Sequence, residues 1–267
     1  MQCLILAGGL ATRMRPITET IPKALIPVGG KPFVDHQLGW LAAHGVTDVV
    51  LSIGYLGGAI RDHLGDGAAL GLRIRYVDEG TRLRGTAGAV RLAYDEGVLE
   101  PRFLVTYGDS FLPIDFAAVW NAFTKSGAPA LMTVFHNQGR WDTSNVIFED
   151  NQTGTLGAFL EPPATTPPGK ARLRQREHGA GRVVLYDKQR RTRPPESFSF
   201  IDYGLSAFER QVIADGVPAG ATADLADLFH GLSIRGQLAG MEVAERFYEI
   251  GSPAGLEDFA AWLRARG

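Results

Sequence analysis

The sequence predicts an α/β protein in which helices cover both faces of a parallel or mostly parallel sheet. Short apolar and β-branched runs recur along the chain, and segments with helical spacing of apolar residues separate them. Glycine turns stand at several of the junctions. Strands and helices that alternate in this way favour parallel strands, because a crossover helix brings the chain back to the edge where the next strand begins.

Size and charge set further limits on the protein. The chain has 267 residues, of which 45% are hydrophobic and 21% are charged, so a sizeable core can form. The net charge of −2 gives no general attraction to nucleic acid or to an acidic membrane surface. Cys3 is the single cysteine, which excludes an internal disulfide. No apolar run is long enough to span a bilayer, and the first run meets Gly8 too early for a signal peptide. We therefore expect a single cytoplasmic domain over residues 1–267, of unknown oligomeric state, that binds neither nucleic acid nor membrane.

The elements of the first half alternate regularly. Pro32 can open a helix and Gly45 can end it, which predicts a helix over residues 31–45. The β-branched run over 48–53 is typical of a strand buried on both faces, whereas 72–77 alternates apolar residues with arginine. Further strands are expected at 4–6 and 103–107, and further helices at 55–64 and 87–95.

The second half contains more strands and one irregular stretch. Strands are expected at 128–135, 144–148, 183–188 and 247–252, and a helix at 223–234. Ser252 followed by Pro253 predicts the start of a last helix, with serine as N-cap and proline as first helical residue. Residues 151–181 are rich in proline, glycine and basic residues without any period, which predicts a flexible insertion loop. Such a loop is usually solvated, and a lid over an anionic substrate or a partner-docking arm is the alternative.

The first functional indication lies at residues 4–23. A short strand breaks into Ala7-Gly8-Gly9, where a backbone without side chains can approach a ligand closely. Thr12, Arg13 and Lys23 follow. Exposed amides and fixed cations at the end of a strand suit a phosphate group. The alternative is a tight turn that carries surface arginines.

The motif L-A-G-G-x-x-T-R-M-R-P, followed by P-K-A-L-I-P-V-G-G-K-P-F, resembles the signature of the sugar-1-phosphate nucleotidyltransferases, or nucleotide-sugar pyrophosphorylases. The resemblance spans nearly the whole chain apart from residues 151–181, and its short form is most similar to heptose-1-phosphate guanylyltransferases and N-acetylmuramate-1-phosphate uridylyltransferases. It implies a Rossmann-like three-layer α/β/α domain with a mostly parallel mixed sheet. It also implies that the protein is an enzyme with Mg²⁺ as its cofactor. Such an enzyme converts a nucleoside triphosphate and a sugar 1-phosphate into a nucleotide-sugar and pyrophosphate. The sequence names neither base nor sugar.

The resemblance also implies roles for individual residues. Arg13 and Lys23 would be catalytic, and Mg²⁺ would bind Asp109 in Y-G-D-S-F and Glu249 in F-Y-E-I-G-S. Asp109 follows a predicted strand, at the edge of a parallel sheet where ligands collect. Nucleotide contacts would fall on Leu6, Ala7, Gly8, Gly9, Thr12, Glu79, Gly85 and Thr86. Sugar-phosphate contacts would fall on Asn145, Lys188, Asp202 and Gly204.

Each of these assignments has a plainer alternative. Asp109 could cap a turn, Thr86 could be the N-cap of an ordinary helix, and Lys188 could be a surface lysine. Two residues also depart from the family pattern: Ala11 stands where glycine is usual, and Glu249 stands where aspartate is more frequent. These departures leave room for a non-catalytic nucleotide-sugar-binding regulatory protein.

A third hypothesis is a metal-dependent glycosyltransferase. Such an enzyme would more usually carry a D-x-D triplet, whereas Asp109 is followed by Ser110 and Phe111. A dinucleotide-binding site is disfavoured because G-G-L-A-T-R does not match G-x-G-x-x-G.

Overall fold

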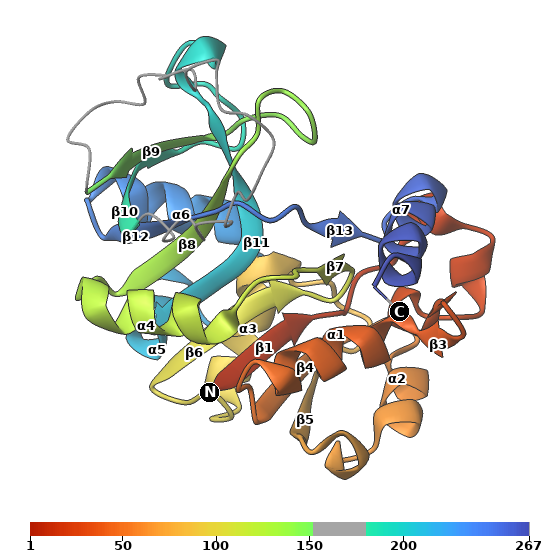
Figure 1. Ribbon diagram of the computed structural model, residues 1–267. Helices are drawn as coiled ribbons and strands as arrows, with labels where there is room; N and C mark the ends of the chain where they lie inside the picture. The colour runs from red at the N-terminus through yellow and green to blue at the C-terminus, as the bar shows by residue number, and fades with distance from the viewer. Residues whose placement is uncertain (152–179, 267) are drawn as a thin grey trace, which may run out of the picture.

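A nine-stranded sheet runs through the centre of the computed structural model, which describes residues 1–151 and 180–266 (Figure 1). The strand order is β5-β4-β1-β6-β11-β8-β12-β10-β9. These strands are β1 (Gln2–Leu6), β4 (Asp48–Ile53), β5 (Arg73–Asp78), β6 (Arg102–Tyr107), β8 (Ala130–His136), β9 (Val146–Asp150), β10 (Ala180–Tyr186), β11 (Phe200–Glu209) and β12 (Leu238–Val243). Within this sheet β10 and β11 run against the other seven strands. The predicted mostly parallel mixed sheet is confirmed.

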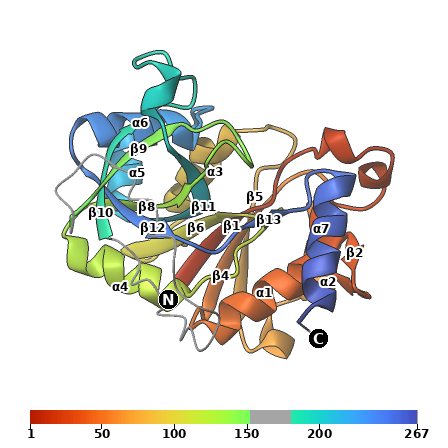
Figure 2. The same ribbon diagram turned by 45° about the horizontal axis from the view of Figure 1, so that its top comes forward.

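Helices cover both faces of the sheet, so the fold has three layers. Helices α1 (Phe33–Ala43), α2 (Gly57–Leu64) and α4 (Phe116–Ser126) pack on one face, and α3 (Gly85–Asp95), α5 (Arg210–Gly216) and α6 (Leu225–Ile234) pack on the other (Figure 2). Alternate residues of the strands pack into the two hydrophobic cores, one on each face of the sheet. In β1, Cys3 and Ile5 enter one core and Leu4 the other.

A third, smaller cluster joins the two ends of the chain. Helix α7 (Pro253–Arg264) places Phe259 against Phe33 and Phe111, with ring centroids 5.3 and 4.7 Å apart. The side chain of Ser252 accepts a hydrogen bond from the backbone N–H of Gly255, so the predicted start of this helix is confirmed. The C-terminal helix therefore packs on the N-terminal half, beside the loop that follows β1.

Two-residue strands complete the fold: β2 (Pro27–Val28) with β3 (Lys31–Pro32), and β7 (Ser110–Phe111) with β13 (Tyr248–Glu249). The strand expected at 247–252 is thus wrong in length and place, because only two residues pair, and they pair outside the main sheet. Helices α4 and α5 and strands β11 and β12 had not been predicted. Ala180 and Gly181 belong to β10, which shortens the expected loop, and its residues 152–179 lie outside the described part of the chain.

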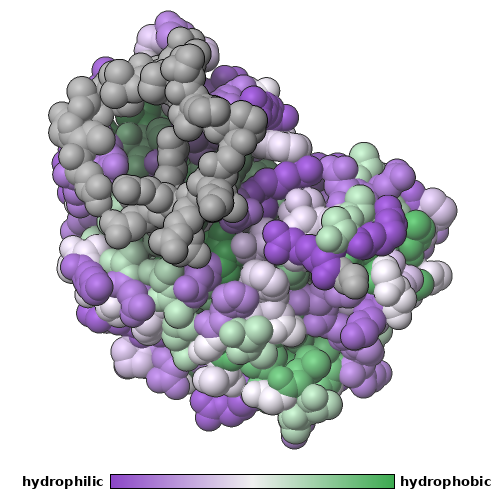
Figure 3. All heavy atoms as spheres, in the orientation of Figure 1, coloured by the Kyte–Doolittle hydropathy of each residue, from purple (hydrophilic) through white to green (hydrophobic). Residues whose placement is uncertain are grey.

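The surface on the side of α7 is mainly hydrophilic, as the space-filling view in Figure 3 shows, and hydrophobic residues reach the surface lower in that view. Within residues 1–151 and 180–266, no helix combines the length and apolar character that a bilayer crossing requires.

Candidate functional site

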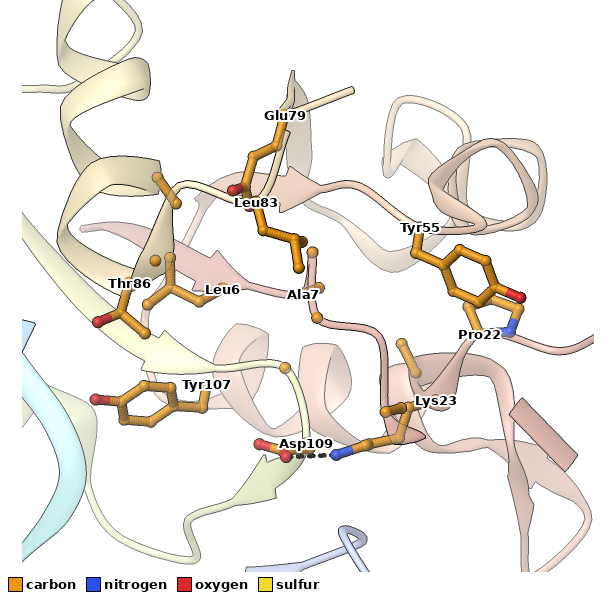
Figure 4. A pocket seen from close by; sticks show the side chains of 17 residues that line it. Leu6, Ala7, Pro22, Lys23, Tyr55, Glu79, Leu83, Thr86, Tyr107 and Asp109 are labelled. Carbon is orange, nitrogen blue, oxygen red and sulfur yellow. Dashed lines mark hydrogen bonds and ion pairs between the residues drawn. The ribbon is translucent and has the colours of Figure 1, made fainter. Parts of the chain in front are cut away.

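The parallel strands β5, β4, β1 and β6 end side by side, and the residues after them enclose a cavity. Backbone hydrogen bonds continue past the strands: Ala7 N donates to Ser52 O (2.8 Å), and Gly108 N donates to Leu6 O (2.9 Å). Glu79 N likewise donates to Ile53 O (2.9 Å). The cavity has a volume of about 340 Å³ and lies at the carboxyl edge of the strands, where ligands collect in such sheets (Figure 4).

Nine of the residues predicted to bind or react line this cavity: Leu6, Ala7, Gly8, Gly9, Lys23, Glu79, Gly85, Thr86 and Asp109. Tyr55, Leu83 and Tyr107 also line it, and no pattern in the sequence had singled them out. Figure 4 shows Leu83 across Ala7 from the Asp109–Lys23 pair, and Tyr55 beside Pro22. The cavity therefore combines apolar side chains, suited to the flat face of a base, with an ion pair at one side, suited to phosphates.

The glycine turn fits its surroundings only because it lacks side chains. A Cβ built on Gly8 would stand 2.3 Å from Oε1 of Glu79, and a Cβ on Gly108 would stand 2.8 Å from that of Ala7. Glu79 is itself fixed, since it accepts hydrogen bonds from Ser52 Oγ (3.1 Å) and from the backbone N of Arg84 (3.3 Å). The buried Glu79 carboxylate thus links the end of β5 to β4 and to the segment before α3, directly behind Gly8.

The charged side of the cavity is built from both ends of the chain. Lys23 Nζ and Asp109 Oδ2 form an ion pair at 2.8 Å, with the two side chains 17% and 31% exposed. A Cβ on Gly251 would lie 3.8 Å from Nη2 of Arg13 and 3.9 Å from Nζ of Lys23. Arg13, which does not line the cavity, therefore reaches the same place as Lys23 from the exposed turn Thr12–Met14. Thr12 lies in that turn, outside the cavity lining.

Glu249 stands next to Asp109. The pairing of β13 with β7 sets Glu249 opposite Ser110, and Ile250 N donates a hydrogen bond to Asp109 O (2.9 Å). Partial removal from water raises the pKa of Glu249, and the charges of Asp109 and Asp142 raise it further.

Two neighbouring carboxylates that repel each other are the oxygen donors that Mg²⁺ prefers, so these residues fit the ion that the resemblance implies. Within the described ranges, no group of three or more His, Cys, Asp or Glu side chains could hold a metal ion. The remaining ligands would therefore come from substrate phosphates or water.

The predicted sugar-phosphate residues do not line the cavity and lie on the far side of Tyr107. A Cβ on Gly204 would lie 3.7 Å from Cδ2 of Tyr107, and Gly204 has a φ of +104°, which favours glycine. Asp202 accepts a hydrogen bond from Gly204 N (3.0 Å), and burial raises the pKa of Asp202 to about 6. Burial, followed by the charge of Asp202, raises the pKa of Tyr107. Tyr107 thus lies between Gly204 and the cavity that it lines.

Lys188 and Asn145 belong to the same region. Lys188 lies two residues beyond the end of β10, not within the strand as expected, and its Nζ contacts Asp224 Oδ2 at 2.9 Å. The side-chain oxygen of Asn145 is buried and has no hydrogen-bond partner among the described residues. A buried acceptor without a partner is costly, which suits a contact with a ligand hydroxyl.

The backbone at Thr86 and at Ala11 bears on two points raised by the sequence. Helix α3 begins at Gly85, so Thr86 lies inside the helix and is not its N-cap. Ala11 adopts the left-handed conformation, with φ +48° and ψ +39°, which glycine adopts more easily. Its carbonyl accepts a hydrogen bond from Thr18 Oγ1 (2.9 Å), which helps to hold the loop in that shape.

The fold and the cavity define a class, the three-layer α/β proteins with a charged cavity at the carboxyl ends of parallel strands. Within that class, the chain belongs to the nucleotidyl transferase family, whose model matches residues 2–221. The family expected from the glycine motif is thus confirmed.

Curated relatives agree with this membership. An N-acetylmuramate α-1-phosphate uridylyltransferase of Neisseria meningitidis is 41% identical over 129 residues, or 48% of this chain and 54% of that protein. A mannose-1-phosphate guanylyltransferase of Mycobacterium tuberculosis is 31% identical over 263 residues, or 97% of this chain and 62% of that protein. The chain thus spans between half and two thirds of the length of these relatives.

Solved structures share the fold. The inositol-1-phosphate CTP transferase of T. maritima has a TM-score of 0.70 and 19% identity, with 98% of this chain and 94% of that chain covered. A UDP-glucose pyrophosphorylase complexed with UDP-glucose has a TM-score of 0.70 and 14% identity, with 100% and 99% covered.

Proposed function

We propose that the chain transfers a nucleotidyl group from a nucleoside triphosphate to a sugar 1-phosphate, giving a nucleotide-sugar and pyrophosphate. The observation that carries the proposal is the Lys23–Asp109 pair on one side of a cavity enclosed by glycine turns, with Arg13 and Glu249 beside the pair but outside the cavity lining. Two cations and two carboxylates there can bind phosphates and a divalent ion together.

The reaction joins two anions, so the protein must neutralise charge and fix geometry. A phosphate oxygen of the sugar 1-phosphate attacks the α-phosphorus in line, and pyrophosphate leaves. Lys23 neutralises charge near the α-phosphate, and Arg13 neutralises charge on the β- and γ-phosphates. Asp109 and Glu249 would hold Mg²⁺, which would supply positive charge to offset that of the phosphates and of the leaving pyrophosphate. The nucleotide rests against seven residues that line the cavity: Leu6, Ala7, Gly8, Gly9, Glu79, Gly85 and Thr86.

The region beyond Tyr107 receives the sugar 1-phosphate. Lys188 positions the attacking phosphate, and Asp202 accepts hydrogen bonds from sugar hydroxyls. The free acceptor of Asn145 takes a further hydroxyl, and Gly204 leaves clearance for the ring. The two substrates would then meet across Tyr107, with the reacting phosphates beside Lys23.

The test is pyrophosphate release in a matrix of four nucleoside triphosphates against a panel of sugar 1-phosphates, with Mg²⁺ present. Release with at least one pair is expected, and UTP and GTP are the first nucleotides to try because the curated relatives are named for their transfer. Nucleotide-sugar binding without release in every combination would identify a regulatory protein instead. Transfer of sugar from a nucleotide-sugar to an acceptor would identify a glycosyltransferase.

A further inference from the structure

Asp224 connects the two substrate regions, although it belongs to neither set of proposed ligands. Its Oδ1 accepts hydrogen bonds from Thr86 Oγ1 (3.0 Å) and from Ala226 N (3.0 Å) at the start of α6. Its Oδ2 accepts one from Lys188 Nζ (2.9 Å). One carboxylate thus holds a residue of the nucleotide cavity with one oxygen and the proposed sugar-phosphate lysine with the other.

The segment that carries Asp224 is fixed to the nucleotide side. Ala223 O accepts hydrogen bonds from Ala87 N (2.9 Å) and Gly88 N (3.2 Å), and Ala223 N donates to Arg84 O (2.9 Å). A Cβ on Gly85 would stand 2.5 Å from Ala223 O, so the two segments touch at a glycine. Thr86 Oγ1 also accepts a hydrogen bond from Leu225 N (2.8 Å). Asp224 therefore presents Lys188 with an anchor that is immobile relative to the nucleotide.

We infer that Asp224 is a positioning residue, which holds the Lys188 ammonium at a fixed distance from the bound nucleotide so that it meets the sugar phosphate. The inference rests on the proposed function, since it assumes the role given to Lys188. The Lys188 side chain is 56% exposed, and a lysine without an anchor would occupy many rotamers in water. Anchoring it beforehand reduces the entropy that is lost when the phosphate binds.

The expected size of the effect follows from the exposure of the pair. Exposed ion pairs contribute roughly 1 kcal/mol or less, which corresponds to about a fivefold change in an equilibrium constant. Asp224→Asn is the informative variant, because asparagine caps a helix as well as aspartate and keeps an acceptor for Thr86. With its oxygen on Thr86 and Ala226 N, asparagine turns an NH2 group toward Lys188, so the variant removes both the charge and the acceptor that hold the ammonium.

The experiment measures the Kd of mannose 1-phosphate and of N-acetylmuramic acid 1-phosphate by calorimetry, and the KM of whichever supports pyrophosphate release. Asp224→Asn should raise the Kd and KM of the sugar 1-phosphate about fivefold and leave kcat and the nucleotide KM within about twofold. Asp227→Asn is the matched control, since Asp227 is exposed in the first turn of the same helix. It should leave all four constants unchanged.

A double variant separates positioning from a merely structural role. If Asp224 acts through Lys188, Asp224→Asn adds nothing to the sugar-phosphate Kd of Lys188→Met. An equal weakening in both backgrounds, or an unchanged Kd in Asp224→Asn alone, overturns the inference while leaving the proposed function intact. If the wild-type protein binds a sugar 1-phosphate but releases no pyrophosphate, the proposed function is refuted. The Kd of the sugar 1-phosphate in Asp224→Asn then still tests whether Asp224 positions Lys188. A wild-type chain that binds no sugar 1-phosphate overturns both.

Discussion

The two ends of the candidate site are built in different ways. The end at the cavity, which we propose binds the nucleotide and call the nucleotide end, is shaped by backbone: Gly8 and Gly108 pack so closely against Glu79 and Ala7 that no side chain fits. The region beyond Tyr107 is shaped by polar side chains, among them Lys188, which reach in from strand ends. A backbone-built site tolerates few substitutions, whereas a site made of side chains can change its ligand by changing a few residues. This contrast suits a family whose relatives carry different sugars.

The largest effect should come from the charges at the nucleotide end. Arg13→Ala and Asp109→Ala should each lower turnover roughly 100- to 1,000-fold, because each removes a charged group placed to act on the reacting phosphates. Thermal unfolding should change little, since Asp109 lines the cavity and Arg13 is exposed beside it, so neither side chain belongs to a hydrophobic core. Lys31→Ala removes an exposed cation outside the cavity and is the control. Turnover like that of the wild type in both variants would refute the roles given to Arg13 and Asp109.

A second prediction tests the backbone directly. Gly8→Ala should lower the free energy of unfolding by about 2–4 kcal/mol, because its Cβ would displace the buried Glu79 carboxylate from its hydrogen bonds. Gly9→Ala is the matched control, since a Cβ there meets nothing within 4 Å and should change the free energy by less than about 1 kcal/mol. Denaturant titration of the two variants compares them. Equal losses would mean that the turn is not held by this contact.

Much of the nucleotide end could be predicted because its determinants are local in sequence. Residues 48–53 form β4 as expected, since a β-branched run buried on both faces has few other structures open to it. The family resemblance singled out nine residues that line the cavity: five from the glycine motif and the segment after it, and the others from residues 79–88 and from Asp109. Tyr55, Leu83 and Tyr107 could not be predicted, because they meet only when the ends of separate strands come together.

The rest of the site depends on contacts between distant residues. Asp224 lies 138 residues from Thr86, and the sequence indicated only a helix beginning near it. Glu249 reaches Asp109 through a two-residue strand that is too short to leave a pattern. Helix α4, by contrast, carried a readable signal that was missed: Asp115 accepts hydrogen bonds from Ala117 N and Ala118 N as N-cap, and Gly127 follows its last residue.

A third prediction concerns the end made of side chains. Asp202 loses its proton near pH 3.8 in the unfolded chain and at about pH 6 in the fold, so the native state binds more protons between these values. The contribution of Asp202 to the free energy of unfolding therefore falls as the pH rises from about 4 to 6. Above about pH 6 Asp202 is ionised in both states, and this contribution no longer changes.

Asp202→Asn keeps an acceptor for Gly204 N and should raise the free energy of unfolding at pH 7.5 by about 1–2 kcal/mol, less than the full shift implies because Asp202 is half-buried. The gain should shrink toward zero at pH 4, as denaturant titrations at several pH values would reveal. If Asp202→Asn raised the free energy of unfolding equally at every pH, the burial of a charged carboxylate would not be the cause of the gain.

The smallest effect belongs to Ala11, at the point where the backbone-built end departs from the family pattern. An alanine in the left-handed region costs roughly 1–2 kcal/mol relative to glycine, and the greater freedom of glycine in the unfolded chain offsets about 0.4–1 kcal/mol of this. Ala11→Gly should therefore raise the free energy of unfolding by about 0–1.5 kcal/mol. Ala69→Gly, in the exposed 3-10 turn Ala68–Leu70, should lower it by about 0.5–1 kcal/mol. Turnover of Ala11→Gly should stay within about threefold of the wild type, because the loop already holds the left-handed conformation. Turnover present only with glycine at position 11 would instead identify the natural chain as the non-catalytic regulatory form.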